Sequence, residues 1–283
     1  MISSAVGLFA LTYALIETNT HAWGSSRVLS LFAVAGLALA TFVALELRQR
    51  VPMLDLSLFR NPTFSGANAT MALVGLAMFG IFFYNSLFLQ NILHYSAIKT
   101  GATFLPMTVL IILVAPAAGK VSDRVGPRWL MGAGMTLLTG SLLLFGTLDA
   151  DSSFWNIVPG LLLGGFGMAI TMAPTTAAAM GSVPVDKAGV GSAVINSMRQ
   201  VGGSLGIAIM GTLIATQVTV GQLNPRYPAE FVDGYHRALQ LGAAILLAGA
   251  ILAVLTVGRE RRAKPEAVAE HDLASSPSVE EAA

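Results

Sequence analysis

Residues 98–148 hold two long apolar runs on either side of a short basic segment, and they read IKTGATFLPMTVLIILVAPAAGKVSDRVGPRWLMGAGMTLLTGSLLLFGTL. The apolar runs occupy 98–118 and 129–148. A bilayer core about 30 Å thick is crossed by a helix of about 20 apolar residues, which is the length of each run. Neither run alternates like the strand of a membrane barrel, and backbone in lipid must satisfy its own hydrogen bonds. Both runs are therefore predicted to be transmembrane helices.

The same pattern extends over most of the chain. Further apolar runs occur at about 1–17, 28–47, 63–90, 155–180, 188–217 and 237–258. The sequence therefore predicts an all-α polytopic membrane protein with about eight transmembrane helices, embedded in the lipid bilayer. Residues 259–283 are charged and rich in Ser, Ala and Glu, so we expect them to form a disordered tail.

The composition excludes several classes of protein. Apolar residues make up 54% of the chain and charged residues only 11%, against a globular norm of about 25% charged. A soluble enzyme would need more polar surface, and the net charge of +1 gives no basic field for nucleic acid. Cysteine is absent, and the patterns HExxH, GxSxG and GxxxxGK(S/T) do not occur. The sequence therefore predicts no metal site, no cofactor and no catalytic centre.

The loops between the apolar runs alternate in charge. Segments 48–62, 119–128 and 181–187 together with the tail hold eleven Lys and Arg residues, whereas the intervening loops hold four. In membrane proteins the loops that are richer in Lys and Arg face the cytoplasm. We therefore expect a multi-pass protein of the cell membrane with both ends, including the C-terminus, in the cytoplasm.

The segment 119–130, GKVSDRVGPRWL, carries the most specific motif. Its first glycine is expected to let the chain leave one helix, and its second, followed by proline, to form the turn into the next. A single aspartate lies among three cations, where it can pair with one of them or cap the following helix. The plain interpretation is a basic cytoplasmic loop, and the functional one is a charge latch that two conformations make and break. The candidate gating-loop residues are Gly119, Asp123, Arg124, Gly126 and Arg128.

The pattern G-x-x-x-D-R-x-G-x-R in this segment resembles the cytoplasmic-loop signature of the major facilitator superfamily. Residues 48–62, RQRVPMLDLSLFRNP, and 181–206, GSVPVDKAGVGSAVINSMRQVGGSLG, are similar to its fourteen-helix drug:proton antiporter branch, the EmrB/QacA group. The resemblance implies two linker helices and a cytoplasmic linker at 1–62, then the C-terminal six-helix bundle at 63–258. It also implies that the first six-helix bundle is missing. The chain would then be a truncated reading frame, a fragment or one half of a split transporter.

The resemblance further implies that the spans at 63–90, 98–118, 155–180 and 188–217 line a central cavity. Two of them carry aromatic, Met and uncharged polar side chains, which suit a bulky lipophilic ligand. For any one of these side chains, packing against a neighbouring helix is the alternative. The candidate cavity residues are Phe82, Tyr84, Asn85, Met168, Thr171, Met172 and Arg199.

Glycines at a spacing of four predict close helix packing. Gly160 and Gly164 form one such pair, and Gly202 and Gly206 form another. Arg199 is the one cation well inside a predicted span, and it opens the R-Q-x-G-G block of the resemblance. A charge at this depth is functional by default in membrane proteins. A structural role, in which Arg199 reaches toward the cytoplasm or caps carbonyls of a neighbouring helix, is the alternative.

These features together predict part of a secondary active transporter and not an enzyme. The resemblance assigns it to proton-coupled efflux of lipophilic or cationic drugs. The expected partners are a small lipophilic substrate and protons. No carboxylate lies at bilayer depth in the predicted bundle, so the protons are expected to be coupled through the missing N-terminal half. A facilitator for another small metabolite is one alternative, since a fold does not fix its substrate. A non-transporting membrane subunit or a truncated remnant is the other.

Overall fold

A computed structural model gives the fold of the chain and describes residues 2–17, 21, 24–48 and 56–258. Within these ranges every regular element is a helix. The helices are α1 (Ile2–Glu17), α2 (Ser26–Arg48), α3 (Pro62–Asn91), α4 (Ala97–Thr103), α5 (Leu105–Val125), α6 (Pro127–Phe145), α7 (Phe154–Gly181), α8 (Ala188–Gln217) and α9 (Tyr227–Thr256). Two short 3-10 helices, η1 (Leu56–Arg60) and η2 (Val185–Lys187), precede α3 and α8.

The predicted all-α membrane fold is confirmed. Seven segments are long and apolar enough to cross a membrane by length and composition, with α4 and α5 counted as one segment. The helix α1 is the eighth, but its apolar part spans only Ile2–Ala14. Its 16 residues reach about 24 Å at 1.5 Å per residue, which is less than the bilayer core.

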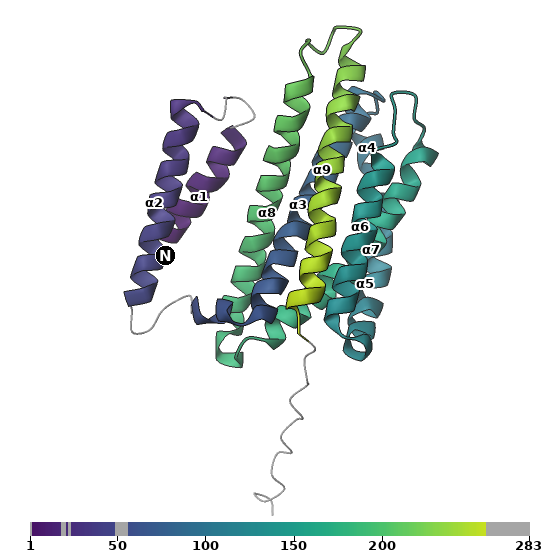
Figure 1. The fold of residues 1–283 in the computed structure, drawn as a ribbon. Coiled ribbons are helices and arrows are strands. Elements are labelled where there is room, and N and C mark those ends of the chain that lie inside the picture. The colour runs from purple at the N-terminus through teal and green to yellow at the C-terminus, as the bar shows by residue number, and fades with distance from the viewer. Residues whose placement is uncertain (1, 18–20, 22–23, 49–55, 259–283) are drawn as a thin grey trace, which may run out of the picture.

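Successive long helices run in opposite directions, so the connections gather at two ends of the bundle (Figure 1). One end, called the basic end below, is where α2, α5, α7 and α9 finish and where α3, α6 and α8 begin. The described cations at the basic end are Arg48, Arg60, Lys120, Arg124, Arg128 and Lys187, and those at the opposite end are Arg27, Lys99, Arg226 and Arg237. The described parts of the loops that the charge pattern grouped together therefore share one end of the molecule, whereas the predicted disordered tail, 259–283, lies outside the described residues.

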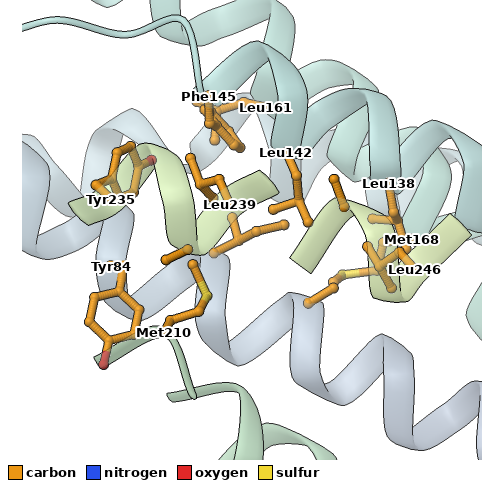
Figure 2. Close-up of a cluster of buried hydrophobic side chains, with 14 of the residues drawn as sticks. Tyr84, Leu138, Leu142, Phe145, Leu161, Met168, Met210, Tyr235, Leu239 and Leu246 are labelled. Carbon is orange, nitrogen blue, oxygen red and sulfur yellow. The ribbon is translucent and has the colours of Figure 1, made fainter. Parts of the chain in front are cut away.

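The helices form a six-span bundle and a separate hairpin. Helix α3 packs on α8, α9 and α7, while α6 packs between α7 and α9, and α5 leans on α7. The hairpin of α1 and α2 lies beside this bundle and meets it through the contact of α1 with α8 (Figure 1). Inside the bundle, large side chains from α3, α6, α7, α8 and α9 interlock (Figure 2). Tyr235, Phe145, Leu138 and Leu246 in this core are essentially inaccessible to solvent.

Glycines set the closest helix approaches. A Cβ added at Gly202 would overlap the Ala72 carbonyl of α3, and one at Gly206 would overlap the Leu76 carbonyl. On α7, a Cβ at Gly160 would lie 2.7 Å from the Phe145 ring, and one at Gly164 would lie 2.7 Å from the Ser141 hydroxyl oxygen, both on α6. Gly202 and Gly206 thus lie where the backbones of α8 and α3 approach each other, whereas Gly160 and Gly164 make room for side chains of α6 against the α7 backbone.

Three helix boundaries differ from those predicted. Helix α5 continues to Val125, seven residues past the predicted end of its apolar run, and α4 is separated from it at Phe104. Helix α9 begins at Tyr227, ten residues before the predicted start of the last span. Hydropathy marks only the part of a helix that lies in hydrocarbon. At about 45 Å, the 30 residues of α9 exceed the bilayer core, so its first turns can carry Glu230 and Asp233.

Candidate functional site

The turn between α5 and α6 is formed by Gly126 and Pro127. Gly126 adopts a φ of 97°, a left-handed conformation that a side chain would strain. Its N–H donates to the Ser122 carbonyl at 2.9 Å, which closes the last turn of α5. Pro127 then occupies the first turn of α6, where its missing N–H costs no hydrogen bond. The predicted Gly-Pro turn is therefore present.

The rest of the predicted gating loop is helical, which corrects the sequence-based interpretation. Gly119, Asp123 and Arg124 lie within α5, so Gly119 does not release the chain from the helix. Gly126 occupies the N-cap position of α6 and has no side chain to cap it, so the capping role of Asp123 stays a prediction. The helix persists because its last turns stand at the membrane surface, where Arg124 favours the negative end of the helix dipole. Asp123 and Arg124 are exposed at the basic end.

One hollow that contains predicted site residues lies where α3, α7 and α8 meet, and we call it the Arg199 hollow. It has a volume of about 160 Å³. Its lining residues are Met71, Met172, Thr176, Ser192, Ile195, Asn196 and Arg199. Two of these, Met172 and Arg199, were predicted from the sequence. The hollow combines flexible thioethers with hydroxyl, amide and guanidinium groups, so it offers both apolar contact and hydrogen bonds.

Arg199 is held in the hollow by its own helix. Its Nη2 donates to Asn196 Oδ1 at 3.1 Å, and Asn196 Nδ2 donates to the Ser192 carbonyl at 3.1 Å. Ser192, Asn196 and Arg199 are thus linked by hydrogen bonds along one face of α8, at spacings of four and three residues. A guanidinium carries five N–H donors, and one of them is used in this bond. The remaining donors make Arg199 suited to an acceptor group that enters the hollow.

The other predicted cavity residues pack inside the bundle. Tyr84 donates its hydroxyl to the Ile207 carbonyl of α8 at 2.6 Å, and Asn85 accepts from the hydroxyl of Tyr235 on α9. Met168 and Thr171 on α7 are at most 1% exposed. In this conformation these four predicted residues hold helices together and do not line an open cavity.

Phe82 is intermediate between these two groups. It is half-buried, and its ring lies 4.9 Å from that of Phe104 at the α4–α5 junction. Sequence reasoning missed Met71, Ser192 and Asn196. The last two lie seven and three residues before Arg199, a helical spacing that puts them on its face, and this was the available signal. Met71 comes from α3, so nothing local to Arg199 could have indicated it.

A second hollow lies between α1 and α8 and has a volume of about 260 Å³. Its lining residues are Leu8, Thr12, Asn196, Ser197, Gln200 and Val201. Asn196 therefore borders both hollows, with the Arg199 hollow on one side and the α1–α2 hairpin on the other. Polar residues of α8 therefore line the place where the α1–α2 hairpin contacts the bundle.

Comparison with known proteins identifies the family. The helices and the hollow described above define a polytopic helical membrane protein. The family model described as Major Facilitator Superfamily matches residues 1–207. The chain belongs to this superfamily, whose members are transporters and not enzymes, and the resemblance to its drug-antiporter branch is confirmed by the relatives below.

The relatives carry names related to drug resistance. The chain is 36% identical over 211 residues to the tetracenomycin C resistance and export protein of Streptomyces glaucescens, covering 75% of this chain and 39% of that protein. It is 35% identical over 210 residues to the multidrug resistance protein Stp of Mycobacterium tuberculosis, covering 74% and 39%. The chain thus spans about two fifths of the length of these relatives.

A solved structure supports the fold alone. A bacterial homologue of the human lysosomal transporter Spinster, in an inward-facing and unoccupied conformation, superposes with a TM-score of 0.59 at 14% identity. The match covers 88% of this chain and 64% of that one. The helix arrangement is therefore similar to that of this solved protein, although the sequences are distant.

Proposed function

We propose that this chain is part of a proton-coupled efflux transporter for lipophilic, often cationic compounds. The observation that carries the proposal is the 35–36% identity to proteins named for multidrug resistance and antibiotic export. The Arg199 hollow is consistent with it, because methionine and hydroxyl groups accept varied lipophilic shapes with few directed bonds. The Arg199 guanidinium suits hydrogen-bond acceptor groups of a substrate, because it is itself a cation and does not attract the substrate's cationic centre.

The proposed organisation follows the relatives, which are longer. Residues 1–62 act as two linker helices and their connection, and 63–258 act as the C-terminal bundle of the transporter. Substrate passes between this bundle and a second six-helix bundle that supplies the proton-binding carboxylate. The Arg199 hollow contributes wall to that path, and the α5–α6 turn with Asp123 acts as the latch between its two conformations.

The proposed orientation has the basic end in the cytoplasm of a bacterial cell membrane. It rests on six described cations at the basic end, against four at the other. The C-terminus then lies inside the cell, because α9 finishes at the basic end.

A dye-efflux assay tests the function. Cells that lack their own drug exporters are loaded with a lipophilic cationic dye, and the complete transporter that contains this chain is expressed. We expect dye to leave the cells when a proton gradient is present, and the efflux to stop when an uncoupler removes that gradient. Efflux that continues without a proton gradient, or no efflux of any lipophilic cation, would contradict the proposal.

A further inference from the structure

An apolar groove runs between α6 and α9, away from the Arg199 hollow. Its volume is about 440 Å³. Its lining residues are Trp129, Gly132, Ala133 and Thr136 on α6, and Leu247, Ala250, Ile251, Val254 and Leu255 on α9. These positions recur every three or four residues on each helix, so the groove follows the helix axes for about 10 Å. It is therefore an elongated channel along the membrane normal.

The walls of this α6–α9 groove are almost entirely hydrocarbon. The one hydroxyl among the lining residues, on Thr136, donates to the Gly132 carbonyl at 2.9 Å and so is satisfied within α6. On the rim, Leu247, Ile251 and Leu255 are 47%, 58% and 77% exposed. In a membrane-spanning helix such exposed aliphatic side chains contact acyl chains, so the groove opens onto lipid.

The groove ends in positive charge. On α6, Trp129 is the lining residue nearest the basic end, and the Arg128 guanidinium lies 4.7 Å from the Trp129 ring centroid. Among the described residues, Arg128 Nε is buried without a hydrogen-bond partner. Lys120, Asp123 and Arg124 lie in the last turns of α5 just before this turn, so the segment holds three cations and one carboxylate. An anion at this end of the groove therefore lies beside the Arg128 guanidinium.

We propose that the α6–α9 groove binds one acyl chain of an anionic phospholipid, with the headgroup phosphate beside Arg128. The apolar channel accepts the chain, Trp129 lies at the level where aromatic side chains meet headgroups, and the guanidinium fork matches phosphate oxygens. A second copy of this chain or another helix would cover the groove without using the charge at its end. The proposal concerns the lipid-facing side of the bundle and does not depend on what the protein transports.

The tryptophans of the chain offer a local probe. There are three, at positions 23, 129 and 155. The double variant Trp23→Phe, Trp155→Phe leaves Trp129 as the only indole, inside the groove. The matched control, Trp23→Phe with Trp129→Phe, leaves Trp155, which is 76% exposed at the start of α7, at the opposite end. Both variants of the full chain are reconstituted in mixed vesicles of phosphatidylglycerol and phosphatidylcholine, with bromine on the acyl chains of one lipid at a time.

Fluorescence quenching then reports which lipid occupies the site. We expect brominated phosphatidylglycerol to occupy the site at Trp129 about fivefold more than brominated phosphatidylcholine, as follows from about 1 kcal/mol per cation near an anionic surface. Trp155 should show no such preference. Arg128→Gln should remove the preference at Trp129 while quenching persists, whereas Arg60→Gln, an exposed cation at the same end, should leave it unchanged. Ala133→Phe should fill the groove and reduce quenching by both lipids.

Each contrary result overturns the proposal. Equal quenching of Trp129 by the two lipids would mean that the groove does not select an anion. If the preference for phosphatidylglycerol survives Arg128→Gln, or if Trp155 shows it equally, the preference comes from the general surface charge and not from the groove. Absence of quenching at Trp129 by either lipid would mean that protein, such as a second copy of the chain, covers the groove.

Discussion

Arg199 was predicted from the sequence as a cavity residue, and it lines a hollow in the structure. It lies well inside a membrane span, lines a hollow with Met172, and uses Asn196 as a hydrogen-bond acceptor. Replacement of Arg199 by Ala removes charged hydrogen bonds worth about 1.5–3 kcal/mol, so transport by the complete protein should fall about tenfold or more. Arg199→Lys keeps the charge but loses the planar fork, and should give an intermediate rate.

The measurement is the initial rate of dye efflux at matched protein level. Gln240→Ala provides a control, because Gln240 is an exposed polar residue on α9 that lines neither hollow. Normal transport by both Arg199 variants would assign the residue a structural role, which is the alternative that the sequence left open.

Asp123 tests whether the α5–α6 turn is a latch or only a marker of topology. Asp123 lies in the last turns of α5 at the basic end, and Lys120, Arg124 and Arg128 are its neighbours in sequence. Two-state couplings of this kind are worth about 1–3 kcal/mol, so Asp123→Asn should lower efflux by about fivefold or more without lowering the protein level. Asp149→Asn, at an exposed aspartate of the opposite end, should transport normally. If both variants transport at the rate of the unchanged protein, the latch hypothesis is wrong.

Among the helices, α3 and α8 make the contact that is most sensitive to size. A Cβ at Gly202 has no room, because it would overlap the Ala72 carbonyl, whose position is fixed by the α3 backbone. Gly202→Ala should therefore destabilise the bundle by about 1–3 kcal/mol, the usual cost of overpacking. Gly189→Ala, in the first turn of the same helix with nothing within 4 Å, should be neutral or stabilising. Thermal unfolding of both variants in detergent, followed by circular dichroism, gives the comparison; equal midpoints would show that α3 and α8 adjust freely.

Helix ends and helix partners mark the limit of prediction from this sequence. The apolar runs located the spans because hydrocarbon selects against charge at every buried position. They misplaced the end of α5 and the start of α9 because both helices continue into water, where Lys120 and Glu230 cost nothing. The cavity residues were hard to predict for a different reason. Whether Tyr84 or Met172 faces a hollow depends on which distant helix lies opposite, and local composition carries no such information.

The orientation of the whole molecule can be tested on two exposed residues. Val185 is 93% exposed at the basic end, and Leu223 is 102% exposed at the opposite end. The chain has no cysteine, so Val185→Cys and Leu223→Cys each introduce a single reactive thiol. An impermeant maleimide added to intact cells should label the Leu223→Cys variant, and should label the Val185→Cys variant only after permeabilisation. Labelling with the opposite pattern would invert the proposed topology.

The placement of carboxylates predicts how far the chain can act alone. The acids described between α3 and α9 all stand at helix ends or in connections, and they are Asp123, Asp149, Asp151, Asp186, Glu230 and Asp233. Glu230 is engaged by the N–H of Thr219 at 2.6 Å, and in the hairpin Glu17 pairs with Arg27 at 2.9 Å. A proton-driven carrier needs a titratable group within the membrane, and these positions do not supply one to the bundle.

The 283-residue chain, purified and reconstituted alone, should therefore move no dye when a pH gradient is imposed across the liposome membrane. Liposomes that hold the complete transporter serve as the positive control, and protein-free liposomes give the leak rate. The expected absence of coupling follows from where the carboxylates lie, so it holds even if the chain binds substrate in the Arg199 hollow. Substrate binding without coupled transport would then show that the substrate-binding residues lie in this chain and the proton-binding group does not. Gradient-driven dye movement by the chain alone would place a proton site among these helices, and would overturn the proposal that a second bundle supplies it.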